Sequence, residues 1–145
     1  MSKTISPDKP KILVVNDYPE LLDIIRRILE AANYKVLCAA TPTEALTLAR
    51  LERPDILLFD LILPGMDGVE LLCQVRDQAR LEQAPIIIMT PLGSASGHFP
   101  VLKIHDLPKD AVDAYLFKPF GRLELLRAVK KALRRQPGIS SLVQA

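Results

Sequence analysis

The feature that most constrains the fold of this chain is the alternation of short, continuous apolar runs with longer segments of helical period. Two runs, Lys11 to Val15 (KILVV) and Ile86 to Met89 (IIIM), are apolar at almost every position, as strands covered on both faces require. Three further runs complete a predicted set of five strands: Tyr34 to Ala39, Ile56 to Phe59 and Ala114 to Phe117. Strands that alternate with helices indicate βα units around a parallel sheet.

The segments between these runs have the apolar spacing of amphipathic helices. In the last of them, the residues expected to face the core are Leu126, Val129 and Leu133. The predicted helices begin after Pro19, at the capping box Thr41–Glu44 (running to about Leu51), after Gly68, and at Gly121 (running to Arg135).

Residues 91–112 interrupt this pattern where a fourth helix is due. The segment contains several glycines and prolines, which favour turns and end helices. We therefore predict an irregular loop from Pro91 to Phe99 and at most a short helical piece between Pro100 and Asp110, so that the fourth helix is irregular or shortened. The folded domain is expected to span 11–135, between flexible tails at 1–10 and 136–145.

Composition narrows the class of protein. A chain of 145 residues, 49% of them apolar, fits one domain with a core that needs no disulfide or metal. No apolar run approaches the length of about 18 residues that a membrane span needs, so a cytoplasmic protein without membrane contact is expected. The formal net charge is only +2, and because the basic excess is confined to the last helix, direct nucleic-acid binding is not expected. Cys38 and Cys73 lack metal-ligand spacing and are interpreted as small core residues.

Polar side chains follow four of the five predicted strands. They are Asn16 and Asp17, Asp60, Thr90, and Lys118 with Pro119. Because ligand sites in doubly wound sheets lie outside the carboxyl ends of the strands, these side chains are expected at one edge. Alternatives exist for each residue taken alone, since Asp17 could cap a helix and Lys118 could be an ordinary surface lysine. A purely structural role is least plausible for Asp60, because burial of an unpartnered carboxylate would cost several kcal/mol.

Four motifs make the sequence recognisable. The stretches ILVVND (12–17), PDILLFDLILPGMDG (54–68), IIIMT (86–90) and DAYLFKPF (113–120) resemble, in their order, the receiver domain of bacterial two-component response regulators, of the single-domain, chemotaxis-regulator-like type. The resemblance covers about residues 11–135. It implies a flavodoxin-like, doubly wound, five-stranded parallel sheet of (βα)5 order.

The resemblance also implies a role for each residue at the strand ends. Asp60 would accept a phosphoryl group from a sensor histidine kinase or a phosphotransfer protein. Thr90 and Lys118 would bind the phosphate, Tyr115 would follow the movement of Thr90, and the Lys118–Pro119 bond would be cis. Mg²⁺ would be the cofactor, held by Asp17, Asp60 and the backbone carbonyl of Ile62. Asn16 is not an acid, but its amide keeps hydrogen-bonding capacity and could hold a metal-bound water.

The chain departs from the family pattern at Asn16, where most receivers have a second acid. One carboxylate fewer should weaken the attraction for Mg²⁺. This departure, together with the interrupted helical pattern of residues 91–112, favours an alternative: a pseudo-receiver that docks partners independently of phosphorylation. A phosphatase of the haloacid-dehalogenase type is disfavoured, because Ile62 cannot supply the acid needed two residues after the nucleophile.

The expected protein is a stand-alone response regulator and a signalling protein rather than an enzyme. Only ten residues follow Arg135, so it is expected to act through a downstream protein that the sequence does not identify. A second copy of the chain is a further candidate partner. The cognate kinase and the signal are not identified by the sequence either.

Overall fold

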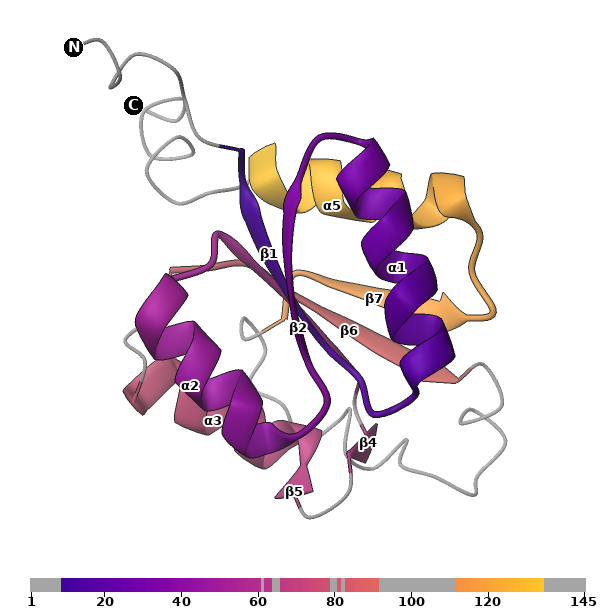
Figure 1. Cartoon of the computed structure of the whole chain (residues 1–145). Helices are drawn as coiled ribbons and strands as arrows, with labels where there is room; N and C mark the ends of the chain where they lie inside the picture. Colours follow the sequence, from indigo (N-terminus) through magenta and orange to yellow (C-terminus); the bar gives the residue numbers. More distant parts are fainter. Residues whose placement is uncertain are drawn as a thin grey trace, which may run out of the picture.

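The central feature of the computed structural model is a parallel sheet of five strands. The structure describes residues 9–60, 62–63, 66–78, 81, 83–91 and 112–134. The strand order is β2-β1-β3-β6-β7 (Figure 1), which is the flavodoxin-like order with its reversal between β1 and β3. The predicted fold class is thus confirmed. The strands are β1 (Lys11–Val15), β2 (Lys35–Ala39), β3 (Ile56–Asp60), β6 (Ile86–Pro91) and β7 (Ala114–Lys118).

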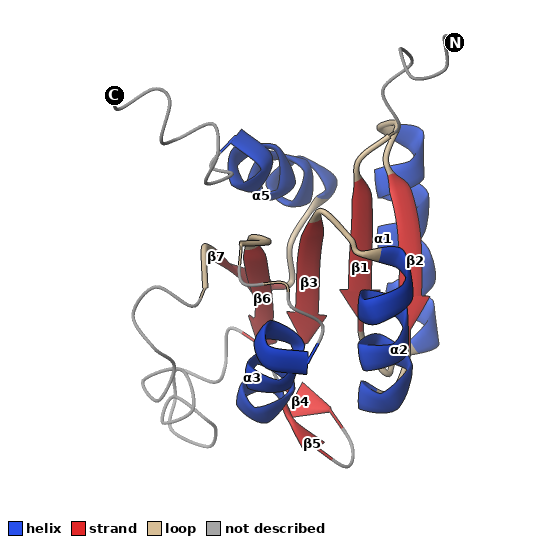
Figure 2. Ribbon diagram, turned by 90° about the vertical axis from the view of Figure 1, so that its left-hand side faces the viewer, coloured by secondary structure: helices blue, strands red, loops and turns tan. Residues whose placement is uncertain are grey.

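Helices cover both faces of this sheet, as Figure 2 shows. Helices α1 (Pro19–Ala31) and α5 (Arg122–Arg134) share one buried cluster with Ile12, Val14 and Leu58 of the strands. Helices α2 (Pro42–Glu52) and α3 (Gly68–Gln78) share a second cluster, on the other face, with Leu13, Leu57 and Phe59. Because neighbouring residues of a strand point to opposite faces, the continuous apolar runs of β1 and β3 supply both clusters.

The sequence predicted the capping box at the start of α2 correctly, whereas two of the residues predicted to be buried in α5 are only partly so. At α2 the Thr41 hydroxyl accepts from the Glu44 N–H at 3.1 Å, and the Glu44 carboxylate accepts from the Ala40 N–H at 2.8 Å. In α5 the buried residues are Leu125, Val129 and Ala132, whereas the predicted Leu126 and Leu133 are only half-buried. Val129 is thus predicted correctly, and Leu126 and Leu133 pack at the margin of the same cluster. Each residue turns a helix by about 100°, so the centre of the buried stripe lies less than one residue earlier than predicted.

Two further expectations need correction. A small antiparallel pair, β4 (Ile62–Leu63) with β5 (Met66–Asp67), follows β3 and was not predicted, since strands of two residues carry no periodic signal. Cys73 is exposed and Cys38 is only half-buried, so neither is a core residue. Cys73 lies on the outer side of α3, because only the opposite side of that helix meets the sheet.

Two aspartates form hydrogen bonds to the neighbouring strand at the amino ends of the sheet strands. Asp113 accepts the Ile86 N–H on its carboxylate and returns its own N–H to the Ile86 carbonyl, each at 2.8 Å. Asp55 makes the same two contacts with Lys11, also at 2.8 Å. Hydrogen bonds between neighbouring strands therefore fix the amino-terminal ends of these strands, opposite the polar carboxyl ends.

Several predictions fall on residues outside the described ranges. These are the irregular fourth helix within 92–111, the C-terminal tail at 136–145 and most of the N-terminal tail at 1–10. No helix in the described part of the chain has the length and apolar character needed to cross a membrane.

Candidate functional site

Three polar side chains from distant parts of the sequence meet at the carboxyl ends of the strands. The Asp60 Oδ2 atom accepts a hydrogen bond from Asn16 Nδ2 at 2.8 Å and lies 2.7 Å from Lys118 Nζ. Asn16 follows β1, Asp60 ends β3 and Lys118 ends β7. The arrowheads of β1, β3 and β6 lie at one edge of the sheet in Figure 2. The sequence argument about strand ends therefore brought these residues to the correct edge.

Lys118 reaches Asp60 across an intervening strand. In the sheet β6 separates β7 from β3, a distance of about 10 Å at the usual strand spacing. The Lys118–Pro119 peptide bond is cis. The lysine and aspartate side chains together span the gap, which brings Nζ to 2.7 Å from Oδ2. The result is an ion pair between the central strand and an edge strand.

Burial makes the Asp60 contacts energetically important. Asp60 is only 6% exposed and Asn16 is fully buried, while the side chain of Lys118 is 26% exposed. A carboxylate removed from water needs a countercharge and hydrogen-bond donors, and the ammonium and the amide supply them. Hydrogen bonds to ionised groups are about twice as strong as neutral ones, so this arrangement holds the carboxylate in one position.

The orientation of the Asn16 amide is fixed by the start of α1. Its Oδ1 atom accepts the Tyr18 N–H at 2.7 Å, a local turn that asparagine forms readily. Since the oxygen is used in this way, the NH₂ group is left to face Asp60. Sequence analysis expected Asn16 to act through a water and did not foresee this direct bond. The only signal was the pairing of β1 with β3, which places the two strand ends side by side.

Thr90 and Tyr115 lie on neighbouring strands next to this cluster. Thr90 lies near the carboxyl end of β6 and is fully buried. It pairs with Phe117 in register, and Ile88 pairs with Tyr115. Paired residues of a parallel ladder share a face, so Thr90 and Tyr115 are diagonal neighbours on the α2 and α3 side. Tyr115 is half-buried against that cluster, and burial raises the pKa of its hydroxyl.

Asp17 and Ile62 are the remaining residues predicted to hold the metal. Asp17 directly follows Asn16 and is exposed. Ile62 begins β4 and pairs with Asp67. Within the described ranges, no three histidine, cysteine or carboxylate side chains are grouped closely enough to form a metal centre. In chemical type, however, the carboxylates of Asp60 and Asp17 and a backbone carbonyl are the oxygen donors that Mg²⁺ takes when it keeps several waters.

Comparison with known proteins agrees with this geometry. The family model of the response regulator receiver domain matches residues 12–130. A CheY-like receiver domain protein from Methanospirillum hungatei is 32% identical, with a TM-score of 0.76 over 88% of this chain and 96% of that one. A response regulator from Chloroflexus aurantiacus is 34% identical, with a TM-score of 0.75 over 88% and 99% of the two chains.

A chemotaxis protein of known structure is also similar to this chain. The chemotaxis protein CheY4 of Vibrio cholerae is 27% identical, with a TM-score of 0.74 over 86% of this chain and 98% of that one. Asn16, Asp60, Thr90 and Lys118 all lie within the residues that the family model matches.

Proposed function

The chain belongs to the response regulator receiver domain family, and we propose on that basis that Asp60 accepts a phosphoryl group from a histidine kinase or a phosphotransfer protein. Receivers are the signalling modules of two-component systems, so the product is a changed interaction surface rather than a released metabolite. The observation that carries the proposal is the Asn16–Asp60–Lys118 cluster. It positions one buried carboxylate at the edge of the sheet where ligands bind.

The reaction requires Asp60 to act as a nucleophile. One of its carboxylate oxygens forms a bond to phosphorus while the bond from phosphorus to the donor histidine nitrogen breaks. The electron pair of that bond stays on the nitrogen, and the product is an acyl phosphate. Carboxylates carry out this chemistry when the charge on the phosphoryl oxygens is offset by positioned cations. Lys118 supplies one such cation, already in contact with the acceptor.

Mg²⁺ fits the oxygen donors at this edge. Asp60 and Asp17 would hold it together with the backbone carbonyl of Ile62, and its charge would neutralise phosphoryl oxygens during transfer. Asn16 donates to Asp60 rather than adding a charge, so the site offers one acid fewer than most receivers. We therefore expect Mg²⁺ to bind more weakly than in receivers with two acids at the end of the first strand.

The signal would pass through Thr90 and Tyr115. With phosphate present, the Thr90 hydroxyl would donate to a phosphoryl oxygen and move towards Asp60. The Tyr115 ring, half-buried on the neighbouring strand, could then fill the space that Thr90 leaves. Such a two-state element responds to a local change of charge. The partners would be a cytoplasmic kinase and a downstream target protein that recognises the changed surface.

Covalent labelling tests the proposal. The purified chain is incubated with a small phosphodonor, such as acetyl phosphate, and Mg²⁺, and its intact mass is measured. One phosphoryl adduct is expected, lost in Asp60→Asn and lost when Mg²⁺ is chelated. Asp113→Asn is the matched control, because this carboxylate lies at the opposite edge of the sheet and labelling should continue. Labelling that survives Asp60→Asn would refute the assignment.

A second candidate function is supported by the same cluster. The buried Asp60 carboxylate accepts from the Asn16 amide and is paired with the Lys118 ammonium, contacts that a pseudo-receiver with a fixed docking surface would also use to stabilise it. In that case the chain would take up no phosphoryl group at any Mg²⁺ concentration. Wild type and Asp60→Asn would then capture the same partner with equal affinity.

A further inference from the structure

Within the part of the chain that the structure describes, no strand pairs with the outer edge of β2. The Lys35 N–H donates to the Pro10 carbonyl, and the Asn16 N–H donates to the Ala39 carbonyl, so Lys35 and Ala39 turn their main-chain groups towards β1. These directions alternate along a strand of a parallel ladder. Val36 and Cys38 therefore point their N–H and C=O groups outward, where β2 is the last strand of the sheet.

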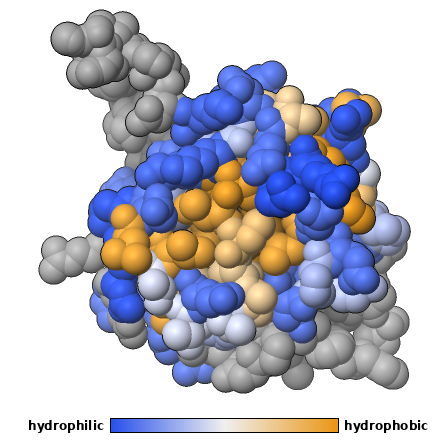
Figure 3. Space-filling view, in the orientation of Figure 1, coloured by the Kyte–Doolittle hydropathy of each residue, from blue (hydrophilic) through white to orange (hydrophobic). Residues whose placement is uncertain are grey.

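Beyond the exposed Lys35 at its start, this edge has little of the usual protection against pairing with another chain. Edge strands are commonly blocked by proline, by charged side chains or by a bulge. Between Val36 and Ala39 the sequence is VLCA, without proline or charge, and the register with β1 is unbroken. Figure 3 shows an apolar area in the middle of this face, over β2 between α1 and α2, with hydrophilic residues around it. An apolar area with a polar rim is typical of an interaction surface.

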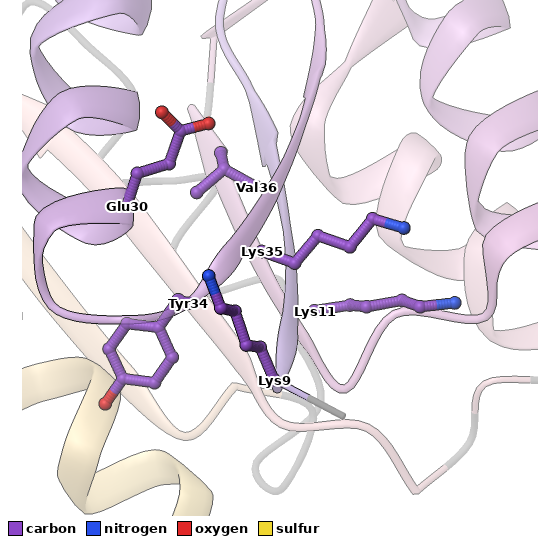
Figure 4. A pocket seen from close by; sticks show the side chains of 6 residues that line it. All are labelled: Lys9, Lys11, Glu30, Tyr34, Lys35 and Val36. Atoms are coloured by element: carbon purple, nitrogen blue, oxygen red, sulfur yellow. The ribbon is translucent and has the colours of Figure 1, made fainter. Parts of the chain in front are cut away.

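Two cavities lie along the same edge, one at each outward residue. The cavity at Val36 has a volume of about 770 Å³, and Figure 4 shows its lining. The cavity at Cys38 has a volume of about 310 Å³ and lies against α2. A strand added to β2 would therefore find space for side chains at both ends. The first cavity is lined by Lys9, Lys11, Glu30, Tyr34, Lys35 and Val36, and the second by Cys38, Thr43, Glu44, Thr47 and Leu48.

The two ends of this edge differ in charge. Lys9 and Lys35 lie at the amino end of β2, whereas Lys11 is engaged by Glu52, with Nζ 3.5 Å from Oε1. The acid that lines this cavity, Glu30, is paired with Arg26 at 3.0 Å, so the end stays basic. At the carboxyl end, Glu44 lines the second cavity. An antiparallel arrangement of two such edges brings the basic end of one to the acidic end of the other. A uniformly acidic partner would match only one end, so the charges favour a second copy of this chain.

We propose that β2 pairs antiparallel with β2 of a second copy, about a two-fold axis at Leu37, to form a homodimer with one continuous sheet. In this register Val36 lies opposite the partner's Cys38, and Cys38 lies opposite the partner's Val36. Both are hydrogen-bonded positions, so the outward N–H and C=O groups of both copies are satisfied. The contact is isologous, as a closed two-fold dimer requires.

The chemistry of Cys38 is compatible with an apolar contact of this kind. Burial raises the pKa of the Cys38 thiol, so the group stays protonated and uncharged at neutral pH. A thiol in that state behaves as a small apolar side chain. The neighbouring Val36 and Leu37 are also half-buried and apolar.

Sedimentation equilibrium of the full chain over a range of concentrations is the first test. A mass that rises from 16.1 kDa towards twice that value is expected for wild type. Val36→Lys should raise the dissociation constant by roughly tenfold or more, because it adds like charges across the contact. Leu51→Lys is the matched control, since Leu51 is 74% exposed on α2 and lines neither of the two cavities. A monomer at every concentration, or a dimer unchanged by Val36→Lys, would overturn the proposal.

A disulfide experiment tests the register independently. Cα atoms of a hydrogen-bonded antiparallel pair lie about 5.5 Å apart, within disulfide range. The Val36→Cys, Cys73→Ser chain should therefore form a covalent dimer on mild oxidation, through the introduced thiol and the partner's Cys38. Adding Cys38→Ser should abolish it. Circular dichroism verifies that the variants are folded, and equal cross-linking with and without Cys38 would contradict the register.

Discussion

At the scale of single residues, the notable contact is the one between Asn16 and Asp60. Asn16 donates to a carboxylate that is nearly buried, and Lys118 supplies the charge. A carboxylate at position 16 would instead place two negative groups at hydrogen-bond distance. Like charges this close disfavour ionisation of both groups, and a divalent cation relieves their repulsion. We therefore expect the amide to lower the affinity of the proposed site for Mg²⁺ and to stabilise the Asp60 carboxylate.

These opposing effects of the Asn16 amide predict how the Asn16→Asp variant behaves. Without Mg²⁺ the variant should lose about 1–3 kcal/mol of unfolding free energy, because a donor to a buried carboxylate is replaced by a like charge. Added Mg²⁺ should restore stability, and phosphoryl labelling should reach half its maximum at a lower Mg²⁺ concentration than in wild type. Thermal unfolding across a Mg²⁺ titration measures the first effect, and intact mass measures the second.

The control for this prediction removes the donor without adding a charge. Asn16→Ala should lose stability as well, yet gain no response to Mg²⁺. If Asn16→Asp responded to Mg²⁺ no more than Asn16→Ala, the amide would not be what limits metal binding.

At this scale the sequence predicted part of the site. Polar residues at strand ends were expected at one edge, and Asp60 and Lys118 do meet there. The direct bond from Asn16 was not predicted, because it depends on the side-chain rotation fixed by the Tyr18 N–H. No spacing rule in the sequence encodes that rotation. The roles of Asp17, Ile62, Thr90 and Tyr115 in binding metal or phosphate stay predictions.

At the scale of elements, the strand order is confirmed while helix phases and short strands are less predictable. Long apolar runs specify β1, β3 and β6 because each is buried on both faces. Val129 of α5 is buried as predicted. The small shift of the stripe around it arises because the helix has apolar residues on two adjacent stripes, and packing on the sheet selects between them. The β4–β5 pair is too short to show periodicity.

The aspartate contacts at the amino ends of the strands give a prediction at this scale. Asp113→Ala should cost about 1–3 kcal/mol of unfolding free energy, because the N–H of the buried Ile86 loses its acceptor. Asp113→Asn keeps an oxygen acceptor and should recover most of that loss. Asp55→Ala removes the equivalent contact at an exposed position and should cost less. Urea unfolding of the three variants checks this order, which an equal loss in all three would contradict.

At the scale of the whole molecule, one sheet separates two apolar clusters. The strands contribute alternate residues to both, so neither cluster can form without the sheet. A domain of this size commonly unfolds in a single transition. We expect the two faces to unfold together even though different helices cover them.

Truncations on opposite faces test this coupling. Ile25→Ala in α1 and Leu72→Ala in α3 remove side chains that are at most 2% exposed, and each should cost about 2–5 kcal/mol. Tyrosine fluorescence and far-ultraviolet circular dichroism should give coincident urea transitions for both variants. Leu51→Ala, at an exposed site, should change stability by less than about 0.5 kcal/mol. Separate transitions for the two faces would show that they are independent folding units.

The ion pair between β3 and β7 also affects when the chain can fold during its translation. Asp60 leaves the ribosome 58 residues before Lys118, and domains tend to fold as units once their sequence is complete. A nascent chain that has not yet reached β7 contains the carboxylate without its cation and β6 without its outer neighbour. Translation through β7 is therefore the step that allows the native state to close, and a pause before that point leaves the chain exposed to proteases and chaperones.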